Sequence, residues 1–250
     1  MKISCVTVCV DYEDFLSFTL PKNLPLLDSI HVVTELNRVQ KLTAVPYISD
    51  KKVTVVGANG IQNDAGFNKG FGIDLALRTC DLNNWVLLLD ADVVLPGDFA
   101  SKLGTLDREY FYGCRRRNFE KLEDFLDVEK GLKQVSDFHL FRGVGYGYFQ
   151  LFHPKSSTFK HLLNVTKGHP FPTCYQTGAC SDWIFRNCWG NFHFVPSLEV
   201  VCFGDSQDYC DGLLRELPME VAHLGLTGRN EFKRLTPRID KILSENSTER

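Results

Sequence analysis

Hydrophobic and polar positions in the first hundred residues follow two alternating patterns. Short apolar runs rich in Val, Ile and Leu, typical of buried strands, are separated by stretches with helical spacing or with turn residues. The runs predict strands at residues 3–10, 29–34, 52–56 and 85–89, and the spacing predicts a helix over 71–79. Because parallel strands need helical crossovers, this order predicts an α/β fold with a mainly parallel central sheet flanked by helices.

The second half of the chain has a different pattern. Aromatic-rich segments with a period of two predict strands at residues 110–114 and 145–152, and further short runs predict a pair of strands at 192–195 and 198–202. Helical spacing is found over 120–133 and again over a shorter stretch from residue 181. These elements predict a smaller mixed or antiparallel sheet in this half.

Composition and charge restrict the class of protein. The chain has 250 residues, of which 44% are hydrophobic and 24% charged, values ordinary for a globular domain. A net charge of −3 favours neither nucleic acid nor an acidic membrane as a partner. No apolar run approaches the roughly 20 residues that span a bilayer, and the first residues lack the features of a signal peptide. We expect one cytoplasmic domain over residues 1–243, a flexible tail over 244–250 and no membrane association.

Nine cysteines, several of them inside apolar runs, are expected to be buried free thiols in a reducing compartment. Four cysteines, Cys174, Cys180, Cys188 and Cys202, fall between His169 and Cys210, together with His193. Their spacing matches no short Cys-x-x-Cys pattern. Scattered core thiols are therefore favoured over a structural zinc site in this region, and the zinc site stays an open alternative.

The most informative segment is the apolar run over residues 85–89, which leads directly into Asp90 and Asp92. Two acids at the carboxyl end of a buried strand are costly unless a cation or strong donors neutralise them. Ligands of open α/β sheets bind at that end. The pair therefore predicts a divalent metal presented to a phosphate-bearing substrate. The alternative is that the two acids only cap a turn before Pro96.

A glycine-containing segment over residues 63–74 precedes the acids. Its glycines allow close approach of backbone to a ligand, and Lys69, next to Asn68, is placed to meet a phosphate or a ribose-bearing group. The segment matches neither of the common phosphate-loop patterns. A helix N-terminus entered by a flexible loop is an equally good interpretation.

Four segments together resemble nucleotide-sugar glycosyltransferases of the Rossmann-like GT-A fold, most closely the family-2-like and galactosyltransferase-like enzymes. The resemblance covers residues 3–230. The segments, in chain order, are Phe67-Asn68-Lys69-Gly70, Asp90-Ala91-Asp92 at the end of its strand, Thr177 to Arg186 and Val221 to Gly225. The third is similar to the acidic segment that supplies the catalytic base, and the fourth to the histidine segment that completes the metal site. Here Ser181-Asp182 replaces the Glu-Asp pair of many members, which leaves Asp182 as the candidate base.

The resemblance implies a metal-dependent hexosyl- or pentosyltransferase. Residues 1–100 would bind the nucleotide sugar, expected to be a UDP-sugar, and residues 101–243, with the smaller sheet, would bind an acceptor hydroxyl. The resemblance assigns Mn²⁺ or Mg²⁺ to Asp90, Asp92 and His223, with Asp90 also near the ribose. Asp182 would take the acceptor proton, giving inversion. For His223 the alternative is a core histidine, and for Asp182 an ordinary acid at a helix start.

Further donor contacts follow from the same resemblance. Asp11 and Tyr12, at the end of the first strand, are expected to contact base and ribose, although a surface turn explains them equally well. Arg229 and Lys233 are expected in a mobile lid over the diphosphate, with a solvated cationic helix as the alternative. Residues 143–149 suit stacking on a sugar or base, but an aromatic core strand is the more frequent explanation.

The acceptor is expected to be a glycan or another hydroxyl-bearing molecule. The basic run over residues 115–117 is interpreted as a solvated face, and its alternative is a phosphorylated acceptor such as a modified base in viral DNA. Two other functions stay open. One is a catalytically weak nucleotide-sugar or carbohydrate-binding module, which is suggested by the serine at position 181 in place of an acid. The other is a metal-dependent nucleotidyltransferase.

Overall fold

The computed structural model describes most of the chain up to residue 203. The described residues are 1–10, 12–63, 66–119, 122–138, 140–141, 147–169, 182 and 185–203. Of the predicted site residues, Tyr12, Asn68, Lys69, Asp90, Asp92 and Asp182 lie within these ranges. Asp11, His223, Arg229 and Lys233 lie outside them.

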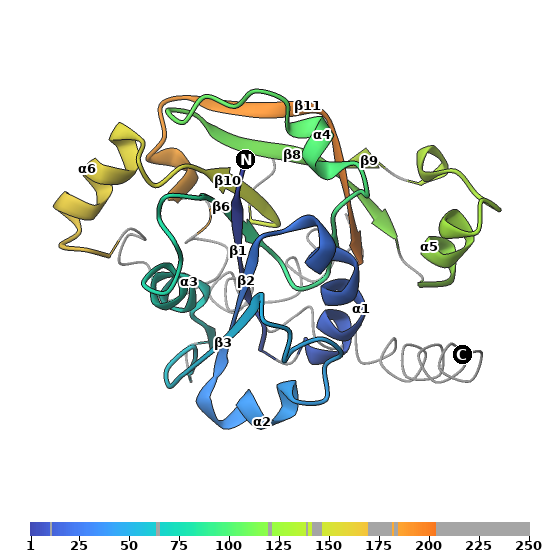
Figure 1. Ribbon diagram of the computed structural model, residues 1–250, viewed down its shortest axis with the longest axis horizontal. Coiled ribbons are helices and arrows are strands. Elements are labelled where there is room, and N and C mark those ends of the chain that lie inside the picture. The colour runs from blue at the N-terminus through green and yellow to red at the C-terminus, as the bar shows by residue number, and fades with distance from the viewer. Residues whose placement is uncertain are drawn as a thin grey trace, which may run out of the picture.

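Nine of the described strands form one curled sheet (Figure 1). Its order is β3 (Val53–Ala58), β2 (Ser29–Glu35), β1 (Ile3–Val8), β6 (Trp85–Leu89), β10 (Phe149–Phe152), β8 (Phe111–Phe119), β11 (Phe192–Phe203) and β7 (Val93–Val94), with β9 (Leu140–Phe141) paired to β8. The first four strands are parallel, and β10 joins β6 in the antiparallel direction. This confirms the predicted α/β class and the Rossmann-like arrangement. The mixed strands of the second half extend the same sheet.

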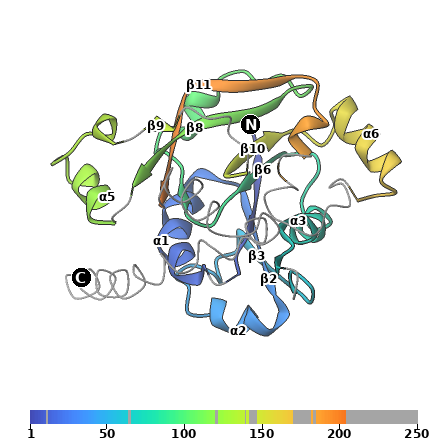
Figure 2. The ribbon, with the colours of Figure 1, turned by 180° about the vertical axis from the view of Figure 1, so that it is seen from behind.

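Helices cover both faces of the sheet. They are α1 (Glu13–Asn23), α2 (Val39–Leu42), α3 (Lys69–Leu77), α4 (Phe99–Leu103), α5 (Leu122–Glu129) and α6 (Ser157–Val165), with short 3-10 turns at Leu24–Leu26, Leu36–Arg38 and Val135–Asp137. Figures 1 and 2 both place α1 and α3 on opposite sides of the parallel strands. A separate hairpin pairs β4 (Gln62–Asn63) with β5 (Gly66–Phe67). Within the described residues, no helix has the length and apolarity to span a membrane.

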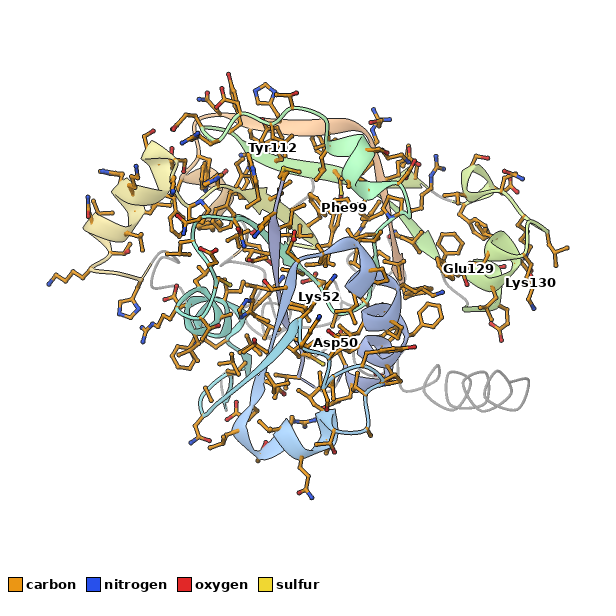
Figure 3. All side chains as sticks on the ribbon, viewed as in Figure 1. Asp50, Lys52, Phe99, Tyr112, Glu129 and Lys130 are labelled. Carbon is orange, nitrogen blue, oxygen red and sulfur yellow. The ribbon has the colours of Figure 1, made fainter. Side chains whose placement is uncertain are left out.

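Two hydrophobic cores, one on each face, explain why β6 is apolar throughout. Leu87 and Leu89 pack in the core that α1, α2 and α4 cover, whereas Val86 and Leu88 pack in the core that α3 and α6 cover. A strand buried on both faces needs apolar residues at every position rather than at alternate ones. Phe99 of α4 lies in the first core, 6.2 Å from the ring of Phe149 (Figure 3).

The structure differs from prediction near the end of the described chain. Residues 192–195 and 198–202 were predicted as two strands, but they belong to one strand, β11, which pairs in parallel with β8. The pairing register shifts between Phe194 and Glu199, on either side of Pro196. Proline has no N–H to give to a strand ladder, so a proline within a strand is accommodated by such an irregularity. Pro196 indicates the irregularity in the sequence, but nothing in the sequence indicates that the strand continues past it.

Candidate active site

Asp90 and Asp92 lie in a tight turn at the carboxyl end of β6. The N–H of Val93 donates to the carbonyl of Asp90 over 3.2 Å, and the N–H of Asp90 donates to the carbonyl of Tyr148 over 3.2 Å. Asp90 follows a strand that lies between β1 and β10, so it stands at the edge where the parallel strands end. The acids therefore occupy the position at which open α/β sheets bind ligands.

Buried polar side chains of α1 form hydrogen bonds with the backbone of this turn and of the residues that follow it. Thr19 Oγ1 donates to the carbonyl of Ala91 over 2.7 Å. Asn23 uses both ends of its amide, because Nδ2 donates to the carbonyl of Val93 over 2.8 Å and Oδ1 accepts from the N–H of Leu95 over 2.9 Å. These bonds satisfy backbone groups that no strand partner reaches, and they fix where the two carboxylates stand. Sequence analysis missed both residues, although two polar residues four apart in an apolar helix were a visible signal.

Lys69 joins the acid turn to Asp182. Its ammonium nitrogen is 2.6 Å from Asp90 Oδ1 and 2.9 Å from Asp182 Oδ2, and it also donates to the carbonyl of Gly147 over 2.9 Å. Lys69 is only 9% exposed and Asp182 only 5%. The three ammonium donors are thus directed at protein oxygens. The structure brings together three residues that sequence analysis had placed in three separate motifs.

Gly147 makes this approach possible. Its φ of +95° lies in a region that residues with side chains avoid, and a Cβ built on it would lie 2.6 Å from Asp182 Oδ2. Any side chain would therefore displace the carboxylate from Lys69. Sequence analysis noted the segment over 143–149 for its aromatic residues, but of its described members it is the glycine that shapes the site.

Burial and mutual charge set the protonation of the cluster. Burial raises the pKa of Asp182 to about 6, with a further contribution from Asp90, while Lys69 acts in the opposite direction. Burial also lowers the pKa of Lys69, but the charges of Asp182 and Asp90 outweigh it and raise that pKa above its usual value. Although burial and the ion pair oppose each other, both residues are charged at neutral pH. We therefore take the Lys69–Asp182 ion pair as the resting state.

Asp182 also has one oxygen left over. Its Oδ1 is buried and makes no hydrogen bond within the described residues. A buried acceptor without a partner costs about 1–3 kcal/mol, so such an atom is seldom left unused. The carbonyl of the same residue is held by Gln150 Nε2 at 3.3 Å. The backbone and one oxygen of Asp182 are fixed, and the other oxygen is available to accept a proton or a hydrogen bond.

Asn68 has a defined structural role at the start of α3. Its Oδ1 accepts the N–H of Phe71 over 3.1 Å, so it is the N-cap of the helix, and its own N–H donates to the carbonyl of Ile61 over 2.6 Å. Glu35 holds the preceding loop, since its carboxylate accepts the N–H groups of Gly60 and Ile61 at 3.0 and 2.9 Å. The alternative of a capped helix N-terminus therefore describes Asn68. Its predicted donor contact stays a prediction.

Tyr12 lies at the same edge of the sheet, immediately before α1. Its carbonyl accepts the N–H of Leu16 over 2.9 Å, and its ring is 5.7 Å from that of Phe15. The side chain is half-buried and packs against the core. Its place after β1 agrees with a contact to base or ribose, which stays a prediction.

The acid pair provides part of a metal site. Burial and, to a smaller extent, the nearby charge of Asp90 together raise the pKa of Asp92 to about 7, as expected for two carboxylates that a divalent cation would stabilise. Hard carboxylate oxygens are ligands that Mn²⁺ and Mg²⁺ accept. Among the described residues, no three His, Cys, Asp or Glu side chains are grouped so as to hold a metal ion. The predicted third ligand, His223, lies outside the described residues.

The cysteine predictions are consistent with the described part of the chain. Cys5, Cys9, Cys114 and Cys202 are buried and free, and Cys80 and Cys188 are half-buried and free. The proposed zinc region is only partly described. In that part, His169 contacts Asp74 at 3.1 Å and Cys202 contacts Asp92 at 3.7 Å, so these residues have other partners.

The sequence matches no family model and no curated protein. Solved structures with similar folds include an inositol-1-phosphate CTP transferase from T. maritima, with 9% identity over 90% of this chain and 95% of the other and a TM-score of 0.48. They also include the galactosyltransferase LgtC, with 12% identity over 88% and 82% and a TM-score of 0.40. A third is mouse xyloside xylosyltransferase 1, with 13% identity over 78% and 85% and a TM-score of 0.40. At these values the similarities decide neither activity nor substrate.

Proposed function

We propose that the protein transfers a sugar from a nucleoside diphosphate sugar to an acceptor hydroxyl, with inversion. The observation that supports this most directly is Asp182. It is buried, charged at neutral pH through its ion pair with Lys69, and keeps Oδ1 without a partner among the described residues. A carboxylate with one oxygen held and the other unused is suited to accept a proton.

The acids at the end of β6 supply the other half of the reaction. Asp90 and Asp92 would hold Mn²⁺ or Mg²⁺, which offsets the charge that develops on a leaving diphosphate. A UDP-sugar is our first choice of donor because the sequence resembles enzymes that use one. The donor would therefore bind at the carboxyl ends of the parallel strands.

The chain's own residues account for the proton and the charge. The acceptor oxygen forms a bond to the anomeric carbon while its proton passes to Asp182 Oδ1. The bond from that carbon to the diphosphate oxygen breaks, and its electron pair leaves with the diphosphate. Lys69 keeps Asp182 ionised before the reaction and joins it to Asp90, so the base and the donor site are held in one rigid group.

The first experiment is a donor screen. UDP-, GDP- and CDP-sugars are tested for Mn²⁺-dependent thermal stabilisation of the protein, with EDTA as the control. We expect one nucleotide class to raise the melting temperature only when metal is present. Pyrophosphate release from a nucleoside triphosphate and a sugar phosphate, without transfer from any nucleotide sugar, would contradict the proposal and indicate a nucleotidyltransferase.

The second experiment tests the base. Asp182→Asn should bind the donor with unchanged affinity by calorimetry, while transfer falls by about 10²–10⁴-fold because the amide accepts no proton. Asp98→Asn, an exposed acid paired with Lys102, is the matched control and should keep full activity. For the unchanged protein, kcat/KM should rise as the pH increases through about 6, where Asp182 ionises. Loss of donor binding together with transfer would assign Asp182 a structural role instead.

A further inference from the structure

Arg116 is a second cation beside the acid turn. It belongs to the basic run over residues 115–117, which we interpreted as a solvated face. The strand separates the three residues: Arg115 is exposed, and Arg117 pairs with Glu199 at 2.8 Å and donates to the carbonyl of Phe138. Arg116 lies on the other face of β8, with its guanidinium 4.8 Å from the centre of the Tyr148 ring.

Strand β11 connects the strand of Arg116 to the acid turn. Strand β11 lies between β8 and β7, so Val200 pairs with Arg116 on one side while Cys202 pairs with Val93 on the other. The thiol of Cys202 donates to Asp92 Oδ2 at 3.7 Å, and the N–H of Phe203 donates to the carbonyl of Asp92 at 3.1 Å. The guanidinium of Arg116 lies over the ring of Tyr148, and the carbonyl of Tyr148 accepts the N–H of Asp90 at 3.2 Å. Tyr148 therefore connects the cation to the acid turn.

The two cations of the site differ in the number and geometry of their N–H donors. Lys69 lies between Asp90 and Asp182, and its three donors are directed at protein oxygens. A guanidinium has five N–H donors in a planar fork, so it can keep contacts within the protein and also bind a phosphate with two parallel hydrogen bonds. Arg116 is half-buried, where such bonds are less screened than at the surface.

We infer that Arg116 binds the diphosphate of the donor and stabilises the charge it gains as a leaving group, which rests on the function proposed above. Lys69 and Arg116 then have separate tasks in the site. Lys69 keeps the base ionised, and Arg116 compensates the negative charge of the diphosphate when the bond to the anomeric carbon breaks. Tyr148 holds the guanidinium in place through its ring face.

The test compares a nucleoside diphosphate with its nucleoside, because the two differ only in the proposed ligand. UDP, GDP or CDP, whichever binds the unchanged protein, is titrated against Arg116→Gln and against the matched control Arg115→Gln. We expect Arg116→Gln to weaken diphosphate binding by about 10–100-fold and to leave binding of the nucleoside unchanged. Its kcat/KM for transfer should fall by a similar factor. Arg115→Gln should behave like the unchanged protein.

A second variant protects the test against misfolding. Arg116→Met keeps an unbranched side chain that packs on Tyr148, and it should show the same selective loss for the diphosphate. If the unchanged protein binds a nucleoside diphosphate and both Arg116 variants bind it equally well, the role of Arg116 is wrong while the proposed function stands. If the unchanged protein binds none of the three nucleoside diphosphates, both the function and the role of Arg116 are overturned.

Discussion

At the scale of single residues, Lys69 balances the charge of the site. It is buried between the partly exposed carboxylate of Asp90 and the buried carboxylate of Asp182, whose burial would be costly without a cation. A lysine also fits because its three donors match three acceptors, namely Asp90, Asp182 and the carbonyl of Gly147. The pairing of Asp90 with Asp182 thus depends on a cation supplied by the first turn of α3.

Replacing Lys69 should destabilise the fold as well as the activity. Lys69→Met leaves Asp90 and Asp182 without their cation, and we expect a loss of about 3–5 kcal/mol in the free energy of unfolding at pH 7. Lys102→Met, which removes a surface pair with Asp98, should cost less than about 1 kcal/mol. Urea denaturation measures both. If both variants lose the same free energy of unfolding, the buried Lys69 ion pairs stabilise the fold no more than a surface ion pair does.

Gly147 allows a second residue-scale prediction with two internal controls. Gly97→Ala has open space and an ordinary φ and should be nearly neutral, whereas Gly131→Ala has open space but a φ of +73° and should cost about 1–2 kcal/mol. Gly147→Ala adds a contact of 2.6 Å with Asp182 to its own positive φ and should cost more than Gly131→Ala. It should also lower transfer activity, because the carboxylate moves away from Lys69. A cost equal to that of Gly131→Ala would contradict the close contact.

At the scale of elements, helix α1 positions the acid turn although it contributes no predicted catalytic group. The hydroxyl of Thr19 and the amide of Asn23 bind three backbone groups between Ala91 and Leu95. The turn lies between β6 and β7, where strand pairing alone does not satisfy all of its backbone groups. The helix therefore fixes the geometry of Asp90 and Asp92 through the backbone of their neighbours Ala91, Val93 and Leu95.

The hydroxyl of Thr19 can be tested without changing side-chain shape. Thr19→Val leaves the carbonyl of Ala91 buried and unsatisfied, so we expect a loss of about 1–3 kcal/mol and a higher KM for the donor. Thr19→Ser keeps the hydroxyl, and Ser17→Ala removes only a bond within the helix to the carbonyl of Glu13. Urea denaturation and initial rates would measure these effects. A KM for Thr19→Val equal to that of Thr19→Ser would show that α1 does not position the turn.

At the scale of the whole molecule, half-buried Asp92 and buried Asp182 make stability depend on pH. Burial raises the pKa of Asp92 to about 7 and that of Asp182 to about 6, both from an ordinary value of 3.8. At pH values between 3.8 and these raised pKa values, the folded protein binds more protons than the unfolded chain. The stability that protonated Asp92 and Asp182 contribute is therefore fully present below about pH 4 and is lost as the pH rises through 6 and 7.

Asp92→Asn should reduce this dependence. In EDTA, the free energy of unfolding of the unchanged protein is expected to fall between pH 4.5 and pH 7.5, and the fall should be shallower in the variant because one of the two ionisations is removed. Asp98→Asn, which alters an exposed acid, should leave the slope unchanged. Denaturant titrations across this pH range provide the measurement. The assignment fails if Asp92→Asn loses stability as steeply as the unchanged protein.

The sequence by itself determined the parallel core of the sheet and the place of the acid pair. Strands β1, β2, β3 and β6 could be predicted because burial on one or both faces leaves a local record of apolar residues. The acids after β6 were visible for the same reason, since charged residues are expensive next to such a strand. These conclusions depend only on neighbours along the chain.

Only the tertiary structure decided how the site is assembled. Lys69 meets Asp90 from 21 residues away and Asp182 from 113 residues away, and no spacing rule predicts which cation will reach which acid. Arg116 differs from Arg115 and Arg117 only by the face of β8 on which it lies. That face became known once β8 was placed between β10 and β11. Tertiary packing determines which distant residues come into contact, and local sequence patterns do not. The residues of this site are therefore far apart in the sequence and are brought together by the fold.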